Sequence, residues 1–244
     1  MDQKLTFYHF FEDRMNLYGD RGNITILANR AKWRGIEVEV KHINDVHDID
    51  LSDADFFMIG GGSDREQGLV THELEAIKDK LAAIIEDGVA GLAICGGYQM
   101  LGNYYELASG EKLPGLGILD FYSKSETTDL SKRLIGNILV KSPEFGNLVG
   151  FENHGGETYH GYPVLGDVVR GFGNTRDGQK EGLVYKNLIC TYIHGPLLSK
   201  NPKLADALLS KMLERKYGDG TLAPLKDLFE DLGNKQEWQR LSSS

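Results

Sequence analysis

The 244-residue sequence has only two cysteines, Cys95 and Cys190. Two thiols cannot form a disulfide framework or supply the ligands of a four-cysteine zinc site, so each must be considered as a single thiol. Long apolar segments are also missing. The longest purely apolar runs, such as Leu81–Ile85, are much shorter than the roughly 20 residues that cross a bilayer. The sequence therefore predicts no membrane span.

Positive charge is scarce as well, since the formal net charge is -9 at pH 7. The acidic residues are spread along the chain, which repels phosphate backbones and argues against nucleic-acid binding. Residues Met1–Arg14 carry three acidic side chains and no basic segment followed by an apolar core, as a secretory signal would have. We expect a cytoplasmic protein that reaches the inner face of the membrane only through a partner or a lipid-linked substrate.

The apolar pattern of the first half predicts alternating strands and helices. Strands are expected at Leu5–Phe10, Ile36–Val40, Asp55–Ile59 and Ala90–Ile94, with an amphipathic helix over Arg65–Glu86. Repeated strand-helix-strand units indicate a mostly parallel central sheet flanked by helices. The fold class is therefore α/β.

The second half changes character and contains short alternating runs, which we interpret as additional strands, some of them antiparallel, in the same domain. These runs are Leu116–Tyr122, Leu134–Val140, Val164–Phe172 and Leu183–Ile193. Asn201-Pro202 begins a clear helix, and a short helix is expected near Leu225–Leu232. We expect one domain over residues 1–200 and a helical extension over 201–244 packed on it, with a frayed tail at Leu241–Ser244.

Cys95 ends the buried strand and is followed by two glycines and a helical segment. This order is typical of a nucleophile elbow, because the sharp turn needs neighbours without side chains. The elbow places the sulfur at a helix N-terminus, where free amides and the helix dipole favour a thiolate. The alternative is that Cys95 is an inert core residue, as free cysteines usually are. Cys190 lies inside an apolar strand without an elbow, and we expect it to be structural.

A thiolate nucleophile needs a base, and His194 is the best candidate because it ends an apolar strand before Gly195-Pro196. His154, in a glycine-bounded loop, is the second candidate. A structural role, with the ring simply hydrogen-bonded, is the alternative for His194. The other histidines have no distinctive context, and we expect surface or structural positions for them: His9, His42, His47, His72 and His160.

Three glycines, Gly60–Gly62, follow the expected buried strand at Asp55–Ile59. Glycine lets the backbone approach a ligand closely, so this turn is a candidate oxyanion or phosphate loop, or a simple tight turn. It is not a Walker loop, because the sequence contains no Gly-Lys dipeptide.

Together these residues resemble the class I, triad-type glutamine amidotransferases of the cobyric acid synthase-like branch. Within this family, the chain is similar to the glutaminase subunits of lipid II isoglutaminyl synthases. The resemblance extends to about Pro202 and is carried, besides the segment around Cys95, by Tyr8–Phe10, Asn16–Asn23, Ile59–Gln67, Gly115–Tyr122, Val149–Gly156 and Gly195-Pro196.

The resemblance implies a class I glutamine amidotransferase-like fold that hydrolyses glutamine and passes ammonia to an ATP-using synthetase. Carried over to this sequence, Cys95 is the nucleophile, His194 is its base, and Arg133 contacts the substrate. Family geometry places the backbone amides of Gly62 and Gly96 in the oxyanion hole. It also places two side chains near bound glutamine, those of Gln99 and Asn153.

The sequence departs from the wider class I pattern at Pro196, where an acidic residue normally follows the histidine by two positions. The residue that orients His194 is therefore unassigned. The resemblance implies a MurT-like Mur ligase partner that holds ATP and magnesium and amidates D-glutamate of lipid II to D-isoglutamine, with no cofactor in this chain. The alternatives are a stand-alone γ-glutamyl or amide hydrolase, a catalytically silent scaffold subunit, and a subunit for a cobalamin-type substrate.

Overall fold

A six-stranded sheet forms the centre of the protein in the computed structural model, which describes residues 3–243. The strand order is β13-β14-β4-β3-β1-β2, and all neighbours are parallel except β13 and β14. The strands are β1 (Lys4–Phe10), β2 (Glu37–Ile43), β3 (Phe56–Ile59), β4 (Ala90–Ile94), β13 (Leu183–Tyr185) and β14 (Leu188–Thr191). Strands β3, β4 and β14 are buried along their whole length, because helices cover both faces of the sheet.

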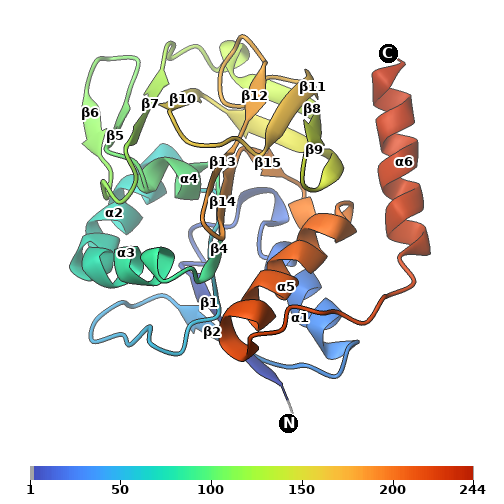
Figure 1. Cartoon of the computed structure of the whole chain (residues 1–244). Helices are drawn as coiled ribbons and strands as arrows, with labels where there is room; N and C mark the ends of the chain where they lie inside the picture. The colour runs from blue at the N-terminus through green and yellow to red at the C-terminus, as the bar shows by residue number, and fades with distance from the viewer. Residues whose placement is uncertain (1–2, 244) are drawn as a thin grey trace.

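Helices α1 (Gly22–Lys32) and α5 (Pro202–Tyr217) lie on one side of the sheet, and α2 (Asp64–Leu74) and α3 (Lys78–Glu86) lie on the other (Figure 1). The single helix expected over Arg65–Glu86 is broken by a 3-10 turn at Glu75–Ile77. Ile77 has φ -121° and ψ 11°, which a continuous α-helix does not allow. None of the helices in residues 3–243 is long and apolar enough to cross a membrane.

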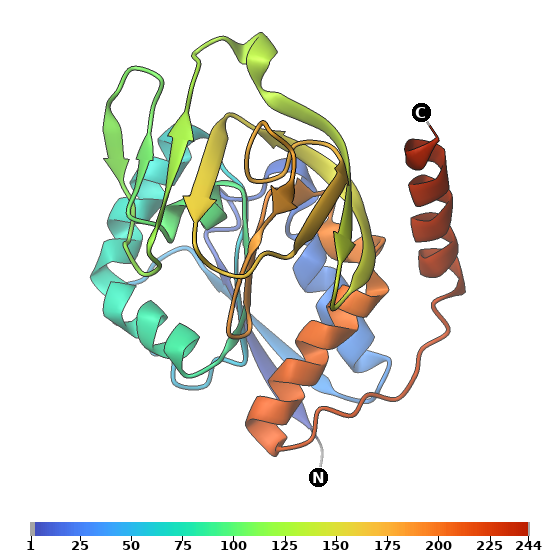
Figure 2. The ribbon, with the colours of Figure 1, turned by 45° about the horizontal axis from the view of Figure 1, so that its top comes forward.

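Two smaller sheets lie over the edge of the central sheet where the parallel strands end (Figure 2). One contains β10 (Gly156–His160), β7 (Phe121–Ser125), β5 (Tyr104–Glu106) and β6 (Lys112–Pro114) in that order. The other contains β12 (Lys180–Glu181), β11 (Gly166–Arg170), β8 (Leu134–Ser142), β9 (Gly146–His154) and β15 (Ile193–His194). The predicted fold class, a mostly parallel sheet with added antiparallel strands, is confirmed.

Two of the expected strands have different boundaries. The run Leu116–Tyr122 enters a strand only at Phe121, because its earlier amides bond to Met100 and Leu101 at the end of α4 (Gly96–Met100). The run Leu183–Ile193 is a hairpin that turns at Lys186, where φ is 52°. After the hairpin, Tyr192 separates β14 from β15, so the chain passes from the central sheet to the upper one.

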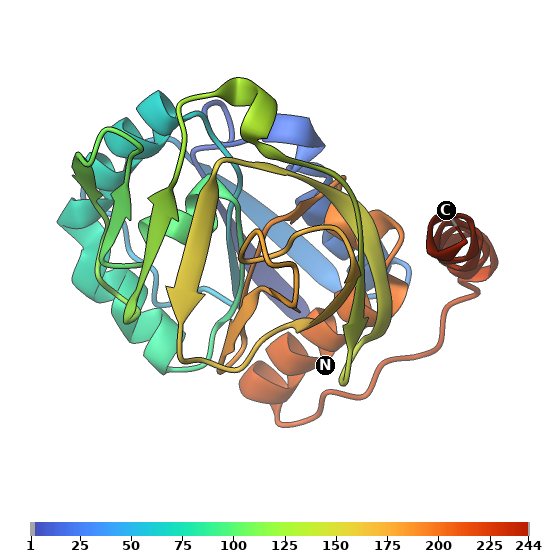
Figure 3. The same ribbon diagram turned by 90° about the horizontal axis from the view of Figure 1, so that it is seen from above.

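The C-terminal segment contains a longer last helix than expected. Helix α5 begins after Asn201 and ends at Gly218, whose φ of 76° is the left-handed conformation common at helix ends. Helix α6 covers Leu228–Ser242 and lies at the side of the molecule, as the view along its axis shows (Figure 3). Leu241 is buried against Leu139 and Val149 of the upper sheet and Ser242 still belongs to α6, so these residues do not fray as expected; Ser244 lies outside the described residues.

Arg30 connects three segments that are far apart in the sequence. Its side chain is only 2% exposed, and its Nε donates to Asp206 of α5 at 2.7 Å. Its two terminal nitrogens donate to both carboxylate oxygens of Asp227, just before α6, at 2.7 and 2.8 Å. A paired, buried guanidinium therefore holds α1, α5 and the start of α6 together.

Replacing Arg30 by methionine should lower the free energy of unfolding by about 2–3 kcal/mol. Removing one partner of a buried ion pair costs more than this, but the two aspartates are partly exposed and can be rehydrated. Urea unfolding at neutral pH measures the change. Lys180→Met, which removes an exposed ion pair with Asp167, should change stability by at most about 0.5 kcal/mol. Equal effects of both substitutions would contradict a special role for Arg30.

Candidate active site

Cys95 lies at the turn between β4 and α4 and has a strained backbone. Its φ of 53° and ψ of -106° are unusual for a residue with a side chain. The turn is possible because the following residues are small: a Cβ on Gly97 would lie 2.3 Å from the carbonyl oxygen of Ile59. These features form the nucleophile elbow that the sequence predicts.

His194 lies beside Cys95 because β14 is paired with β4 on one side of the elbow. The amide of Cys95 donates to the carbonyl of Thr191 at 2.9 Å, and His194 follows Thr191 by three residues in β15. A Cβ on Gly61 would lie 2.8 Å from Cε1 of His194 and 3.4 Å from Cβ of Cys95. The structure therefore brings both predicted catalytic residues together around Gly61.

Asp20 completes a triad that sequence reasoning missed. Its two carboxylate oxygens lie 3.0 and 3.1 Å from Nδ1 of His194, and both side chains are fully buried. One of these oxygens also accepts a hydrogen bond of 2.8 Å from the amide of Gly61. The loop that carries Asp20 follows β1, so the acid reaches the histidine from another strand end of the same sheet edge.

The position that normally holds the acid has a packing role here. Pro196 contacts the start of α1, since a Cβ on Gly22 would lie 2.3 Å from its Cγ. Asp20 is 174 residues away from His194 in the sequence. The only signal for it was an acidic residue in a glycine-containing loop after the first parallel strand.

The pair of Asp20 and Cys95 controls the charge of His194. Burial alone lowers the pKa of a histidine, but the contact with Asp20 and the neighbouring Cys95 outweigh it and raise the pKa of His194 to about 10. Its Nε2 has no hydrogen-bond partner among residues 3–243. The ring is therefore held protonated at Nδ1, and Nε2 is available to exchange a proton with the thiol and a substrate.

Gly62 and Gly96 lie next to each other beside the elbow. A Cβ on Gly96 would be 3.2 Å from the amide nitrogen of Gly62. Gly96 is also the first residue of α4, and the first amides of a helix have no partner within it. Two amides in this position are suitable for holding an oxyanion.

A chain of contacts leads outward from His194 to Arg133. The ring of Tyr18 meets that of His194 edge-on at a centroid distance of 4.9 Å, and its hydroxyl accepts from Nδ2 of Asn153. Asn153 in turn accepts from Nε of Arg133 at 2.9 Å and, through its carbonyl, from Nη2 at 3.2 Å. Arg133 is therefore half-buried and oriented, where an isolated arginine would be exposed.

A cavity of about 300 Å³ lies beside Arg133 and is lined by residues including Asp64, Tyr105 and Gly155. Burial, together with the charges of Asp64 and Cys95, raises the pKa of Tyr105 to about 12. Tyr105 is therefore a buried, neutral phenol in the wall of the cavity. The cavity has an acidic and a basic group and is large enough for an amino acid.

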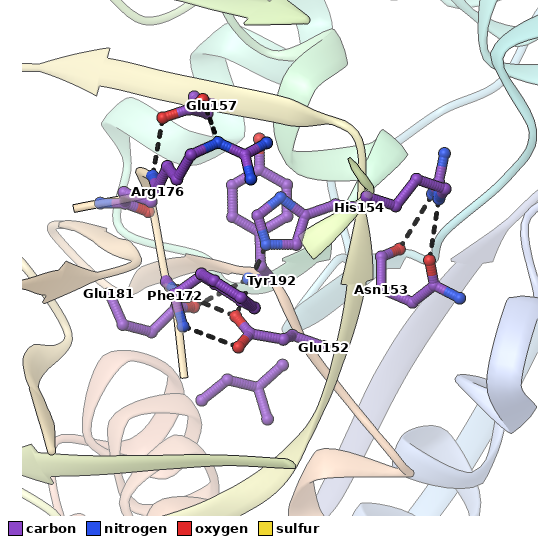
Figure 4. Close-up of polar contacts among 12 residues, drawn as sticks. Glu152, Asn153, His154, Glu157, Phe172, Arg176, Glu181 and Tyr192 are labelled. Carbon is purple, nitrogen blue, oxygen red and sulfur yellow. Dashed lines mark hydrogen bonds and ion pairs between the residues drawn. The ribbon is translucent and has the colours of Figure 1, made fainter. Parts of the chain in front are cut away.

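Gln99 and His154 have internal partners instead of facing this cavity. Gln99 is 4% exposed and donates from Nε2 to the hydroxyl of Tyr192 at 3.0 Å. The ring of His154 stacks on Tyr192 at 3.8 Å (Figure 4). Its Nδ1 lies 2.7 Å from the carbonyl oxygen of Gly156. His154 ends strand β9, not a loop, and takes no part in the triad.

Two buried carboxylates accept hydrogen bonds from main-chain amides, Glu181 from an amide just before His194 and Glu152 from amides just after β11. Glu181 accepts from Oγ1 of Thr191 at 2.6 Å and from the amide of Tyr192 at 2.8 Å, and burial raises its pKa to about 7. Glu152 accepts from the amides of Phe172 and Gly173 at 2.7 and 2.9 Å (Figure 4). Neither role was predicted, because most of the donors are backbone amides, which the sequence does not identify.

Comparison with known proteins agrees with this geometry. Residues 7–202 match the family described as the CobB/CobQ-like glutamine amidotransferase domain. The chain is 54% identical over 213 residues, covering 87% of it and 86% of the relative, to the lipid II isoglutaminyl synthase (glutamine-hydrolyzing) subunit GatD of Staphylococcus aureus. It is 38% identical over 232 residues, with 94% and 87% covered, to the subunit of the same name from Streptococcus pneumoniae.

A solved structure described as a glutamine amidotransferase superposes with a TM-score of 0.59 at 16% identity, covering 84% of this chain and 98% of that one. At this identity the similarity concerns the fold alone.

Asp20→Asn should lower kcat by at least about 100-fold, because loss of the orienting carboxylate has such an effect in serine triads. The pKa of His194 should also fall, so the alkaline limb of kcat/KM should move to lower pH, where the imidazolium is lost. Steady-state rates of glutamine hydrolysis against pH test this. Asp13→Asn, an exposed residue of the same segment, is the matched control. An unchanged pH profile in Asp20→Asn would show that Asp20 only supports the fold.

Proposed function

The chain belongs to the CobB/CobQ-like glutamine amidotransferase family, and on this premise we propose that it is the glutamine-hydrolysing subunit of a lipid II isoglutaminyl synthase. The observation that carries the proposal is the buried Cys95, His194 and Asp20 set at one strand-end edge. Sequence identity to the two GatD subunits supports the choice of reaction within the family.

The residues suggest a thioester mechanism. The thiolate of Cys95 attacks the side-chain amide carbon of glutamine, and the resulting oxyanion accepts hydrogen bonds from the amides of Gly62 and Gly96. His194, held by Asp20, gives a proton to the departing ammonia as the carbon–nitrogen bond breaks. The histidine then takes a proton from water, which attacks the thioester, releases glutamate and restores the thiol.

The cavity beside Tyr105 is suitable for the amino-acid end of the substrate. Arg133 has a planar guanidinium that can bind the α-carboxylate through two parallel hydrogen bonds. Asp64 lines the same cavity and offers a negative charge for the α-ammonium group. Glutamine bound in this way directs its side-chain amide towards the elbow.

The ammonia produced needs a partner, because free ammonia is mostly protonated at neutral pH and is lost to solvent. We propose a MurT-like Mur ligase that holds ATP and magnesium and activates the α-carboxylate of D-glutamate in lipid II. The names of the relatives, which describe a subunit of a synthase, support a multi-subunit enzyme. The lipid-linked substrate of the partner would bring the complex to the inner face of the membrane.

Cys95→Ala should abolish glutamate release from glutamine, by about four orders of magnitude or more, since the nucleophile is removed. Release is measured for the purified chain alone and for the chain coexpressed with a Mur-ligase-like partner. Cys190→Ala is the control and should retain most of the activity.

The outcomes distinguish the proposal from its alternatives. Glutamate release that increases with the partner supports the two-subunit enzyme. Full activity without any partner, and no recoverable complex, would indicate a stand-alone amide hydrolase. Absence of activity in every condition would indicate a silent scaffold, and activity that survives in Cys95→Ala would exclude the thioester mechanism.

Arg133→Ala should raise the KM for glutamine by about 10- to 100-fold, which corresponds to the 1.5–3 kcal/mol of a hydrogen bond to a charged group. The value of kcat should change less, because the carboxylate is bound equally in the ground and transition states. Lys132→Ala is the control, since its side chain is exposed and adjacent. A fall in kcat at constant KM would contradict a role in substrate binding.

A further inference from the structure

Two histidines without a distinctive sequence context are brought together at the ends of neighbouring strands. His9 of β1 and His42 of β2 are paired in the register of the central sheet. Glu12 follows β1 after two residues, and its carboxylate turns back between the two rings. The three residues thus form a cluster outside the triad.

The distances within this cluster suit metal ligation. Oε2 of Glu12 lies 3.2 Å from Nδ1 of His9 and 3.0 Å from Nδ1 of His42. One ligand atom from each of the three residues lies within 4.8 Å of the others. Zinc bound tetrahedrally by nitrogen and oxygen at about 2.0–2.2 Å has ligand atoms about 3.3 Å apart. The carboxylate oxygen is therefore near the required distance from both rings.

The burial of His9 and its lack of hydrogen-bond partners indicate that its ring binds a ligand. Its side chain is 1% exposed, and neither ring nitrogen has a hydrogen-bond partner among residues 3–243. The contact with Glu12 is short enough for an ion pair but lacks hydrogen-bond geometry. A buried polar group without a partner is costly and rare.

We propose that His9, Glu12 and His42 bind one divalent transition-metal ion of the zinc type. Two imidazoles and one carboxylate are a common ligand set for this ion, with water in the fourth position. The side chain of His42 is 51% exposed, so the ion has a path from solvent. This site uses no cysteine and is independent of the proposed glutaminase activity.

The position of the site suggests what the ion does. Glu12 belongs to the segment that connects β1 to Tyr18 and Asp20, and Phe11, just before it, has a left-handed φ of 52°. A metal bond from Glu12 to two strands of the central sheet would fix this segment at its base. The ion should thus stabilise the folded chain, because it binds the folded state and not the unfolded one.

The test uses Cys95→Ala protein freed of metal with a chelator, so that the catalytic thiol cannot bind the added ion. We expect one zinc ion per chain by calorimetry and a rise in Tm on adding zinc. Cobalt(II) should give the visible absorption of a tetrahedral site without thiolate bands. Adding His42→Ala to this protein should abolish the rise in Tm and reduce affinity at least 10-fold.

The matched control is His47→Ala in the same background. His47 is an exposed histidine with a carboxylate, Asp45, at 2.6 Å but no third candidate ligand among residues 3–243, so its removal should leave zinc binding unchanged. The proposal is overturned if metal-free protein binds no zinc, if binding survives His42→Ala, or if His47→Ala weakens binding equally. None of these results depends on glutaminase activity, so they are separate from the test of the proposed function.

Discussion

The contact between Asp20 and His194 determines how the rest of the site is arranged. It joins a loop after the first strand to the end of the last one, across the parallel strands that carry Cys95 and the glycine turn. Both side chains are fully buried, so the ion pair must be complete when the chain folds, because an unpaired charge there would be strongly destabilising. Folding of the central sheet therefore also assembles the proposed catalytic base, His194.

The contact between Asp20 and His194 leaves no room for side chains at the neighbouring glycine positions. Gly61 lies between the carboxylate, the imidazole and the nucleophile, and any side chain would collide with His194. Gly97 lies against the backbone of β3, which lets Cys95 adopt its positive φ. A strained residue of this kind costs about 1–3 kcal/mol. The tightly packed core of the sheet offsets this cost, and the turn places the thiol past the strand end, beside His194.

Local patterns in the sequence predicted most of the strands and helices, and they identified Cys95 and His194 as candidate site residues. The buried strands before Gly60 and Cys95 and the helix after Asn201 show clear apolar periodicity, and they lie where expected. The acid could not be found in this way, since Asp20 meets His194 only through pairing of distant strands. The full length of α6 was not predicted for the same reason, because its one buried residue, Leu241, packs on strands far away in the sequence. Tertiary contacts leave no periodic signal in a short polar segment.

The two cysteines show why position, more than residue type, determines reactivity. Cys190 lies on β14 directly beside Ala93 of β4, two residues before the elbow, so the two thiols are on neighbouring strands. Burial raises the pKa of the Cys190 thiol well above its ordinary value, because no charge or helix end compensates for desolvation. Cys95 lies past the end of its strand, where a helix begins and His194 adjoins it. This short distance along the sheet separates a buried core thiol from the proposed nucleophile.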